Sequence, residues 1–323
     1  MILAGDIGGT NARLGLFDVS SERLKAVATA TYPSRQHASL EQIVARFMNG
    51  QRATPKRACF AIAGPVSEGR ALATNLGWSV EAEHLGRVLG LKDVDVINDL
   101  EAIGHGLREL DESDVAVLHA GTIGAEGNRG IIAAGTGLGE AGAYWDGRRH
   151  HPFAGEGGHT DFGPRTSVEI ELFTRLAAKF GRVSYERILS GSGLREIYEF
   201  LRGRGHGQEP PWLTQEFAED PPPVVVVRNA LNGRSELCRE AVDHFISIYA
   251  AEAGNLALKI MARGGVWIGG GIAPRILARM REPAFLEAFV AKGRMRPVLE
   301  GMAVRVILND KVGLMGAARY ASH

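Results

Sequence analysis

The chain has 323 residues, of which 45% are hydrophobic and 23% charged, and its 37 basic side chains balance its 37 acidic ones. This length allows two compact domains or one large one, and the balanced charge gives no basic field for nucleic acid. No apolar run approaches the roughly 20 residues of a membrane span, and the N-terminal stretch lacks the pattern of a signal peptide. The two cysteines, Cys59 and Cys238, form no CxxC pair, so we expect a cytoplasmic protein without a zinc ribbon or a disulfide framework.

Strands and helices alternate along the first third of the sequence. MILAGDIGGTNARLGLFDV predicts a strand, a glycine turn and a second strand, and SLEQIVARFMN predicts a helix. RACFAIAGPV predicts a strand that ends in a Gly-Pro turn, VEAEHLGRVLGL a helix, and VDVIN a short buried strand. This alternation predicts an α/β fold.

The pattern restarts after a polar stretch at 108–114. RGIIAAGTGLGEAGAYWDG again predicts strand, glycine turn and strand, and helical patterns follow at 166–180 and 193–202. The stretch from Gly203 to Pro223 is rich in glycine and proline and predicts a loop. A long helix at about 235–261 follows. GGVWIGGGIAPRILARM then predicts a strand, a glycine turn and a helix with Pro274 near its first turn, before the strand AVRVIL and a short helix.

Two segments of the sequence resemble each other. ILAGDIGGTNARLGLFD, from Ile2, and IIAAGTGLGEAGAYWD, from Ile131, both pass from an apolar strand through a Gly/Thr turn into a second strand that ends in Asp. A strand-turn-strand unit used twice indicates two related halves.

The glycine motifs allow several interpretations. A Walker loop needs GxxxxGK[ST], and the nearest candidate, GPVSEGRA, lacks both the lysine and the hydroxyl residue. Gly137, Gly139 and Gly142 fit GxGxxG, but a dinucleotide-binding motif must open a helix and the residues that follow are strand-like. The remaining interpretation is two hairpin turns that bind phosphate oxygens through backbone N–H groups and the hydroxyls of Thr10 and Thr136. The alternative is that both turns are ordinary hairpins. The pairing of the turns and the later WIGGGIAPRI favour the phosphate interpretation.

Each polar candidate residue has a structural alternative. Asp99 follows the strand VDVIN, where a carboxylate could accept a proton, but Asn98 or Asp99 could equally cap the next helix. Glu156 and His159 lie among glycines in GEGGHTD and could face a ligand or solvent. On sequence alone Glu186 is a surface glutamate, and Asp6 could bond its own backbone in a turn.

The set of motifs resembles a known family. GDIGGTNARLGLFD, AAGTGLG and GGVWIGGGIAPRI, in that order, resemble the sugar kinases of the actin and hexokinase fold. With INDLEAIGHG, GEGGHTDFGP and YERILSGSGL, the chain is similar over nearly its whole length to bacterial ATP-dependent glucokinases without zinc. The zinc-bearing group carries a cysteine-rich motif beside the histidine, and this chain has no cysteine near His159.

The resemblance implies an architecture and a reaction. It implies the two-domain actin-like ATPase (ribonuclease-H-like) fold with an interdomain cleft, a small domain at 1–110 joined by a C-terminal helix at about 311–323, and a large domain at 111–310. It implies phosphoryl transfer from ATP, with Mg²⁺ and without zinc, to the 6-hydroxyl of D-glucose as a step that feeds glycolysis. A homodimer without nucleic-acid or membrane partners is also implied. Phosphorylation of mannose, fructose or N-acetylglucosamine, a non-catalytic sensor and a nucleotide-driven conformational machine are the alternatives.

The resemblance also implies roles for individual residues. It makes Asp99 the catalytic base and places Asp6 near Mg²⁺, through water. The implied sugar ligands are Asn98, Asp99, Glu156, His159 and Glu186. The implied nucleotide contacts are Gly5, Asp6, Ile7, Gly8, Gly9 and Thr10 in the first turn, Gly135, Thr136 and Gly137 in the second, and Gly269, Gly270 and Gly271 beside adenosine.

Overall fold

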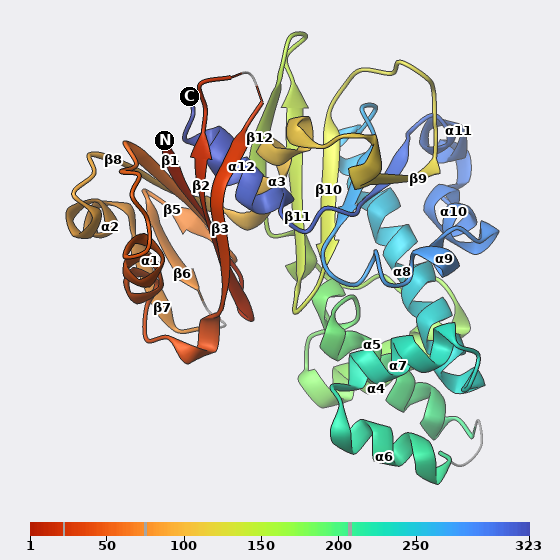
Figure 1. Ribbon diagram of the computed structural model, residues 1–323. Helices are drawn as coiled ribbons and strands as arrows, with labels where there is room; N and C mark the ends of the chain where they lie inside the picture. The colour runs from red at the N-terminus through yellow and green to blue at the C-terminus, as the bar shows by residue number, and fades with distance from the viewer. Residues whose placement is uncertain (22, 74–75, 206–208) are drawn as a thin grey trace. The chain divides into compact units, whose positions relative to one another are not determined.

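The chain divides into two compact units in the computed structural model, which describes residues 1–21, 23–73, 76–205 and 209–323 (Figure 1). The first unit comprises Met1–Val115, Ala141–Gly155 and Asn309–His323, and the second comprises Ala116–Glu140 and Glu156–Leu308. The sequence-based domain boundaries at 110 and 310 stay a prediction.

The first unit is built on a five-stranded sheet. In spatial order its strands are β3 (Lys25–Pro33), β2 (Asn11–Asp18), β1 (Ile2–Ile7), β4 (Arg57–Ile62) and β8 (Asp93–Asn98). The first three form an antiparallel meander, and β4 and β8 run parallel to β1. A smaller antiparallel sheet follows β4 and consists of β5 (Val66–Ser67), β6 (Arg70–Ala73) and β7 (Trp78–Glu81).

Alternate residues of the central strands enter two different cores. Leu3 and Phe60 pack with α1 (Leu40–Met48) and α2 (Ala82–Leu89) on one face of the sheet. Ala4 and Cys59 pack with α3 (Asp99–Gly106) and α12 (Val312–Tyr320) on the other. Because both faces are covered, these strands are almost continuously apolar. By the same alternation, Asp6 lies on the face that α3 and α12 cover.

The second sheet repeats the strand order of the first. In spatial order its strands are β12 (His150–Gly155), β11 (Leu138–Trp145), β10 (Arg129–Ala134), β13 (Val266–Gly269), β14 (Val304–Ile307) and β9 (Val115–His119). As in the first sheet, a strand-turn-strand unit is extended by a third strand on one side and by two parallel strands, here β13 and β14, on the other, and β9 adds a sixth strand beyond β14. The two similar sequence segments are therefore the central hairpins of two sheets with one strand order.

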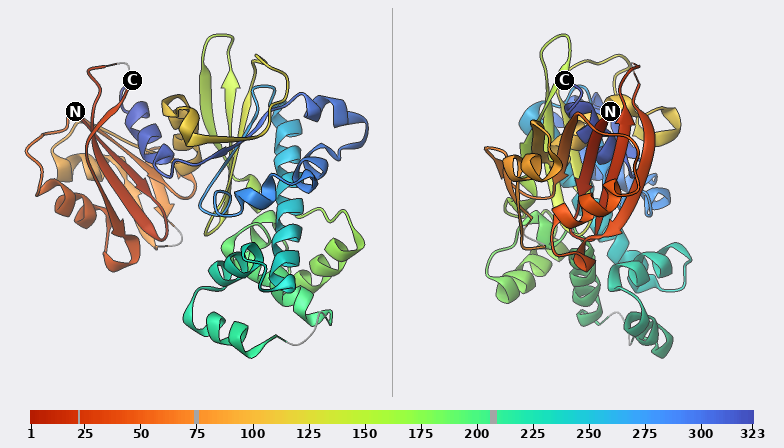
Figure 2. Two further views of the ribbon diagram at one scale, coloured as in Figure 1. Left: turned by 45° about the vertical axis from the view of Figure 1, so that its right-hand side comes forward. Right: turned by 60° about the vertical axis from the view of Figure 1, so that its left-hand side comes forward.

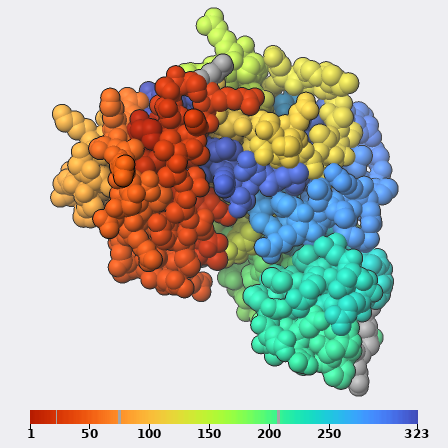
Figure 3. Space-filling view, viewed as in Figure 1, coloured from red at the N-terminus to blue at the C-terminus, as the bar shows by residue number. Residues whose placement is uncertain are grey.

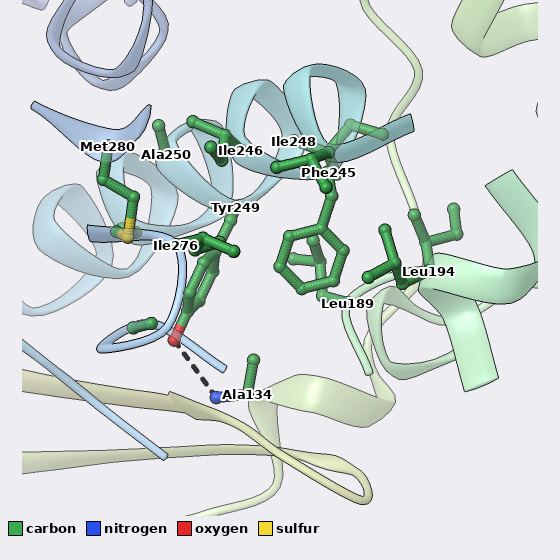
Figure 4. Close-up of a cluster of buried hydrophobic side chains, with 14 of the residues drawn as sticks. Ala134, Leu189, Leu194, Phe245, Ile246, Ile248, Tyr249, Ala250, Ile276 and Met280 are labelled. Atoms are coloured by element: carbon green, nitrogen blue, oxygen red, sulfur yellow. Dashed lines mark hydrogen bonds between the residues drawn. The ribbon is translucent and has the colours of Figure 1, made fainter. Parts of the chain in front are cut away.

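The long helix α8 (Glu236–Ile260) belongs to the second unit, where it packs on the second sheet and extends among the other helices (Figure 2). Its Tyr249 is fully buried, and the hydroxyl accepts a hydrogen bond from the N–H of Ala134 at 3.1 Å and donates to the carbonyl of Ile132 at 3.3 Å (Figure 4). This contact fixes the end of β10. The remaining helices are α4 (Ser167–Phe180), α5 (Gly191–Gly203), α6 (Pro211–Glu219), α7 (Pro222–Leu231), α9 (Leu277–Met280), α10 (Pro283–Val290) and α11 (Arg296–Glu300).

Two sequence-based expectations about this unit are wrong. The loop expected between Gly203 and Pro223 contains α6 and the start of α7, because Pro211 and Pro222 occupy the first turns of helices, where a missing N–H costs nothing. These helices contribute to one surface of the unit (Figure 3), and residues 206–208 of the stretch lie outside the described part. The helix expected directly after Gly269–Gly271 begins only at Leu277, after a series of turns. Of the helices in the described part of the chain, none combines the length and apolar composition that crossing a bilayer requires.

Candidate functional site

The candidate residues of the first unit lie at one edge of its sheet. Ile7, Ile62 and Asn98 are in register across β1, β4 and β8, and each is the last residue of its strand. The turn after β1 and the start of α3 therefore lie at the carboxyl ends of parallel strands, where ligands bind in open α/β sheets.

Backbone groups shape the first glycine turn. The Gly8 N–H donates to the carbonyl of Asn11 at 2.9 Å, and Ser34 donates from its hydroxyl to the carbonyl of Gly8 at 2.8 Å and from its N–H to the carbonyl of Thr10 at 2.9 Å. The Thr10 side chain is exposed and the turn is partly so. Gly5 and Ile7, which precede the turn, are buried. A side chain at Gly5 would lie 2.6 Å from Phe60, and the Ile7 side chain belongs to the core. Gly5 is therefore a glycine because of strand packing.

Asp6 lies near the end of β1, one strand residue before the turn. Its carboxylate is 3.5 Å from the guanidinium of Arg13, which also reaches Asp310 at 3.1 Å. Burial raises the pKa of Asp6, while Arg13 lowers it. A methyl group at Gly313, in the first turn of α12, would lie 3.3 Å from the carboxylate, so a larger residue there would crowd it. The Asp6 side chain is 19% exposed, so the carboxylate is mostly but not fully buried.

Asn98 is the cap of α3, as the structural alternative proposed. Its side-chain oxygen accepts from the N–H groups of Leu100 and Glu101 at 2.9 and 3.2 Å, and its amide donates to the carbonyl of Gly64 at 3.1 Å. The side chain is only 4% exposed. Asp99 is the first helical residue and is half-buried, and one of its oxygens accepts from the N–H of Leu100 at 3.0 Å. A helix N-terminus favours a negative side chain at this position.

The glycine turns of the second unit are neighbours at the corresponding edge of its sheet. Ala133 and Gly269 are in register across the parallel strands β10 and β13. The Ile272 N–H donates to the carbonyl of Ala134 at 3.3 Å, and Gly270, at φ +83°, packs so closely on that carbonyl that a side chain would collide with it. The turn at 135–137 and the turn at 269–271 therefore start from adjacent strand ends.

Glu186 is not a surface glutamate. It lies on a short 3₁₀ turn, Tyr185–Arg187, and its carboxylate accepts a hydrogen bond from the N–H of Leu138 at 3.1 Å. A side chain at Gly137 would collide with the same carboxylate. The structure thus places one implied sugar ligand directly against the second glycine turn.

Glu156 directly precedes and His159 ends a second 3₁₀ turn, Gly157–His159, and their side chains are 47% and 57% exposed. Their Oε2 and Nε2 atoms are 3.9 Å apart. The N–H of Tyr185 donates to the carbonyl of Thr160 at 3.0 Å, which ties this turn to the turn that carries Glu186. The three implied sugar ligands of the second unit are therefore carried by two connected turns.

Sequence reasoning missed a buried acid beneath the Glu156–His159 turn. Glu140 of β11 is 3% exposed and lies so close to Gly157 that a side chain there would collide with it. Burial and the neighbouring Glu252, which is fully buried on α8, raise the pKa of Glu140 to about 8. Glu252 in turn accepts from Asn255 at 2.7 Å and from Lys259 at 3.4 Å. The available signal was a glutamate at an inward position of the apolar strand LGEAGAYW.

Carboxylates and glycine turns are the main polar features at the carboxyl-terminal edges of both sheets. Within the described ranges, three or more His, Cys, Asp or Glu side chains nowhere gather in a group that could hold a metal ion. The first edge combines an aspartate beside a glycine turn with an aspartate at a helix start. The second combines two glycine turns with two glutamates and a histidine.

Comparisons with known proteins identify the family. The Glucokinase family model matches residues 3–323. A glucokinase of Nostoc punctiforme is 41% identical, with 100% of this chain and 99% of the relative covered. A crystal structure of glucokinase from an Antarctic psychrotroph has a TM-score of 0.82 at 30% identity, over 99% of this chain and 98% of that one. A ROK family glucokinase from Streptomyces griseus, in complex with glucose and AMPPNP, shares the fold at a TM-score of 0.61 and 20% identity, over 99% of each chain. The chain therefore belongs to the glucokinase family, ATP-dependent sugar kinases with the actin-like two-domain fold.

Proposed function

We propose that the protein transfers the γ-phosphoryl group of ATP to the 6-hydroxyl of D-glucose, giving glucose 6-phosphate and ADP. The observation that carries this proposal is the position of Asp99, at the start of a helix and at the same sheet edge as the glycine turn after β1. Membership of the glucokinase family supports the sugar and the donor.

Asp99 is the proposed general base. Transfer needs a group that accepts the proton of the attacking hydroxyl, and phosphoryl transfer otherwise rests on positioning and charge stabilisation. A helix N-terminus favours a negative side chain at this position, and the hydrogen bond from the N–H of Leu100 orients the Asp99 carboxylate. Asn98, which caps the helix, sets the backbone of Asp99, and the second N–H of its amide is the group that would donate to a sugar hydroxyl.

Glu156, His159 and Glu186 are the proposed sugar ligands of the second unit. A carboxylate accepts hydrogen bonds from two neighbouring hydroxyls, and an imidazole either donates or accepts, so the trio suits a polyol. Because two connected turns carry all three side chains, their spacing is set by backbone hydrogen bonds rather than by a flexible loop.

The glycine turns are the proposed nucleotide contacts. The N–H groups of Gly8 and Gly135 already donate within their turns, so the remaining N–H groups of the turns at 8–10 and 135–137, with the exposed hydroxyls of Thr10 and Thr136, are the proposed donors to phosphate oxygens. The turn at 269–271 is proposed to border adenosine. In the AMPPNP-bound Streptomyces griseus protein the same fold holds a nucleotide, which supports this assignment by fold alone.

Asp6 fits a role at Mg²⁺. Magnesium in proteins keeps several waters and uses one or two carboxylates, which matches a partly exposed aspartate beside a phosphate turn. When bound with ATP, the ion would neutralise charge on the phosphates. Arg13 keeps Asp6 oriented, and Asp6→Asn is expected to raise the Mg²⁺ concentration needed for half-maximal activity.

A coupled ATP assay with glucose, mannose, fructose and N-acetylglucosamine tests the proposal. Wild-type protein is expected to prefer glucose by kcat/KM. A higher kcat/KM with another hexose would show that this hexose, and not glucose, is the preferred substrate. Binding of glucose without formation of ADP would show that the protein is a sensor and not an enzyme.

A cytoplasmic homodimer is part of the same proposal. Both cysteines are unpaired and buried, which is typical of proteins from reducing compartments. Size-exclusion chromatography with light scattering at several protein concentrations is expected to give twice the chain mass of 34.7 kDa.

A further inference from the structure

A pocket rich in arginine lies at the amino-terminal ends of β10, β13 and β14. Its volume is about 490 Å³, and Arg129, Arg263, Arg305 and Trp267 line it together with Thr122 and Ile123. We name it the arginine pocket. All of its lining residues belong to the second unit.

The strand register explains why these side chains meet. Trp267 pairs with Ile131 on one side and with Arg305 on the other, and Arg129 precedes Ile131 by two residues. In parallel strands, paired residues and residues two apart point to the same face. The neighbouring Val266 and Val304 point to the opposite face, into the core with α8.

The arginine pocket is separate from the candidate site. The glycine turns at 135–137 and 269–271 follow the carboxyl ends of β10 and β13, whereas Arg129 begins β10 and Arg263 precedes β13. The two sites therefore lie at opposite edges of one sheet. The proposed phosphoryl transfer therefore does not account for the cluster of arginines in the arginine pocket.

The arginines of the arginine pocket face no acidic side chain among the pocket-lining residues that the structure describes. Within the same described part of the chain, none of the three arginines forms an ion pair. Instead, the guanidinium groups of Arg129 and Arg305 lie over the Trp267 ring, 5.8 and 5.2 Å from its centre. Many other arginines of this unit, such as Arg165, are paired with a glutamate.

Burial makes this arrangement costly. It lowers the pKa of both Arg129 and Arg305, and for Arg129 the charge of Arg305 lowers it further, with no carboxylate acting in the other direction. The Nε–H of Arg129 and the indole N–H of Trp267 are buried without a hydrogen-bond partner. A buried donor without a partner is unfavourable, so the unpaired charge and the two unpartnered donors both favour an anionic ligand.

We propose that the arginine pocket binds a small molecule that carries a phosphate group. Guanidinium groups bind phosphate oxygens through paired N–H donors, and a phosphate monoester carries close to two negative charges, which suits three arginines better than a single carboxylate does. The exposed Ile123 and Val117 supply an apolar wall for the carbon part of the ligand. The volume falls within the range of small-molecule sites.

Isothermal titration calorimetry of the full chain tests this inference. The probes are inorganic phosphate, pyrophosphate and glucose 6-phosphate, with glucose as the uncharged comparison. Arg129→Gln and Arg305→Gln are expected to weaken binding of the preferred phosphate probe by about tenfold or more each. Arg281→Gln removes one positive charge from an exposed position outside the pocket and is expected to bind like wild type.

The same titrations are followed by tryptophan fluorescence, to which Trp267 contributes as one of the four tryptophans of the chain. A saturating change in wild type that disappears in Arg129→Gln and Arg305→Gln, while glucose phosphorylation is retained, supports the pocket. Tighter binding of glucose 6-phosphate than of inorganic phosphate identifies an ester as the ligand, and the reverse order identifies the free ion.

Two results would overturn the inference. One is wild-type affinity in both variants, because the binding would then lie elsewhere, such as at the glycine turns. The other is the absence of saturable binding of any phosphate probe to wild type. If Arg129→Gln or Arg305→Gln fails to fold, the exposed Arg263→Gln gives the same comparison without disturbing the buried side chains.

Discussion

The carboxylate of Glu186 accepts a hydrogen bond from the N–H of Leu138 at 3.1 Å, at the first residue after the second glycine turn. The same carboxylate occupies the space that a side chain at Gly137 would need. A proposed sugar ligand and a proposed phosphate turn are therefore in direct contact. A change in the turn is expected to affect the sugar side as well.

Gly137→Ala is expected to displace Glu186 and raise KM for both glucose and ATP. Gly50→Ala is the control, because the space around Gly50 is open, its φ is not positive and it lies outside the proposed site. Steady-state kinetics with each substrate varied in turn gives both constants. An unchanged KM for glucose in Gly137→Ala would contradict a role of Glu186 in sugar binding.

Replacement of the proposed base is expected to lower the chemical rate more than binding. Asp99→Asn keeps a hydrogen-bond acceptor for Leu100 but removes the proton acceptor, so kcat is expected to fall by about 10²–10⁴ while KM for glucose changes less. Glu101→Gln alters a carboxylate in the same helical turn and serves as the control. A kcat for Asp99→Asn near that of wild type would assign the base elsewhere.

Asn98 has two proposed roles that mutation can separate. Asn98→Ala removes the helix cap and is expected to lower the free energy of unfolding by about 1–2 kcal/mol, measured in urea, and also to raise KM for glucose. Ser39→Ala removes the cap of α1 and is expected to lower stability without changing KM. Equal KM values in Asn98→Ala and wild type would limit Asn98 to the structural role.

The buried Glu140 predicts a pH dependence of stability. Its pKa is about 8 in the folded protein and ordinarily 4.5, so the folded state holds a proton that the unfolded state releases. The contribution of Glu140 to the free energy of unfolding is therefore largest below pH 4.5, falls between pH 4.5 and 8, and is constant above that. Glu140→Gln is expected to remove this decline relative to wild type.

Thermal unfolding of both proteins across pH 5 to 9 measures the difference. Glu83→Gln, at an exposed position of α2, controls for the loss of one carboxylate. Because Gly157 packs on Glu140, KM for glucose is also expected to rise above pH 8 in wild type but not in Glu140→Gln. Parallel pH profiles for the two proteins would contradict a proton held by Glu140 beneath the Glu156–His159 turn.

The sequence predicted the central hairpins and the main helices because each has a strong local period. The Ser39 and Thr166 caps, for example, begin helices where the pattern predicted them. The loop prediction at 203–223 failed because proline was interpreted as a helix breaker, although Pro211 and Pro222 lie where proline starts a helix. The small sheet β5–β7 was missed because its strands are too short for alternation to be visible.

For the candidate site, motifs located the residues but not their contacts. The contact of Glu186 with the turn after β10 joins positions 48 residues apart, and no local pattern encodes it. Asn98 was placed correctly at the helix start, but only its three hydrogen bonds decide that it is the cap. The burial of Glu140 and the formation of the arginine pocket depend on which face of a strand is covered. The order of the strands in the sheet determines this, and the local sequence does not.

The last helix of the chain completes the first unit. Ile2 and Ala4 of β1 share a core with Leu314 and Ala317 of α12, whereas the segments of the second unit end at Leu308. During synthesis on the ribosome, the face of β1 that carries Ile2 and Ala4 therefore stays exposed until α12 has been translated. We therefore expect the first unit to complete its core only after the segments of the second unit have been synthesised.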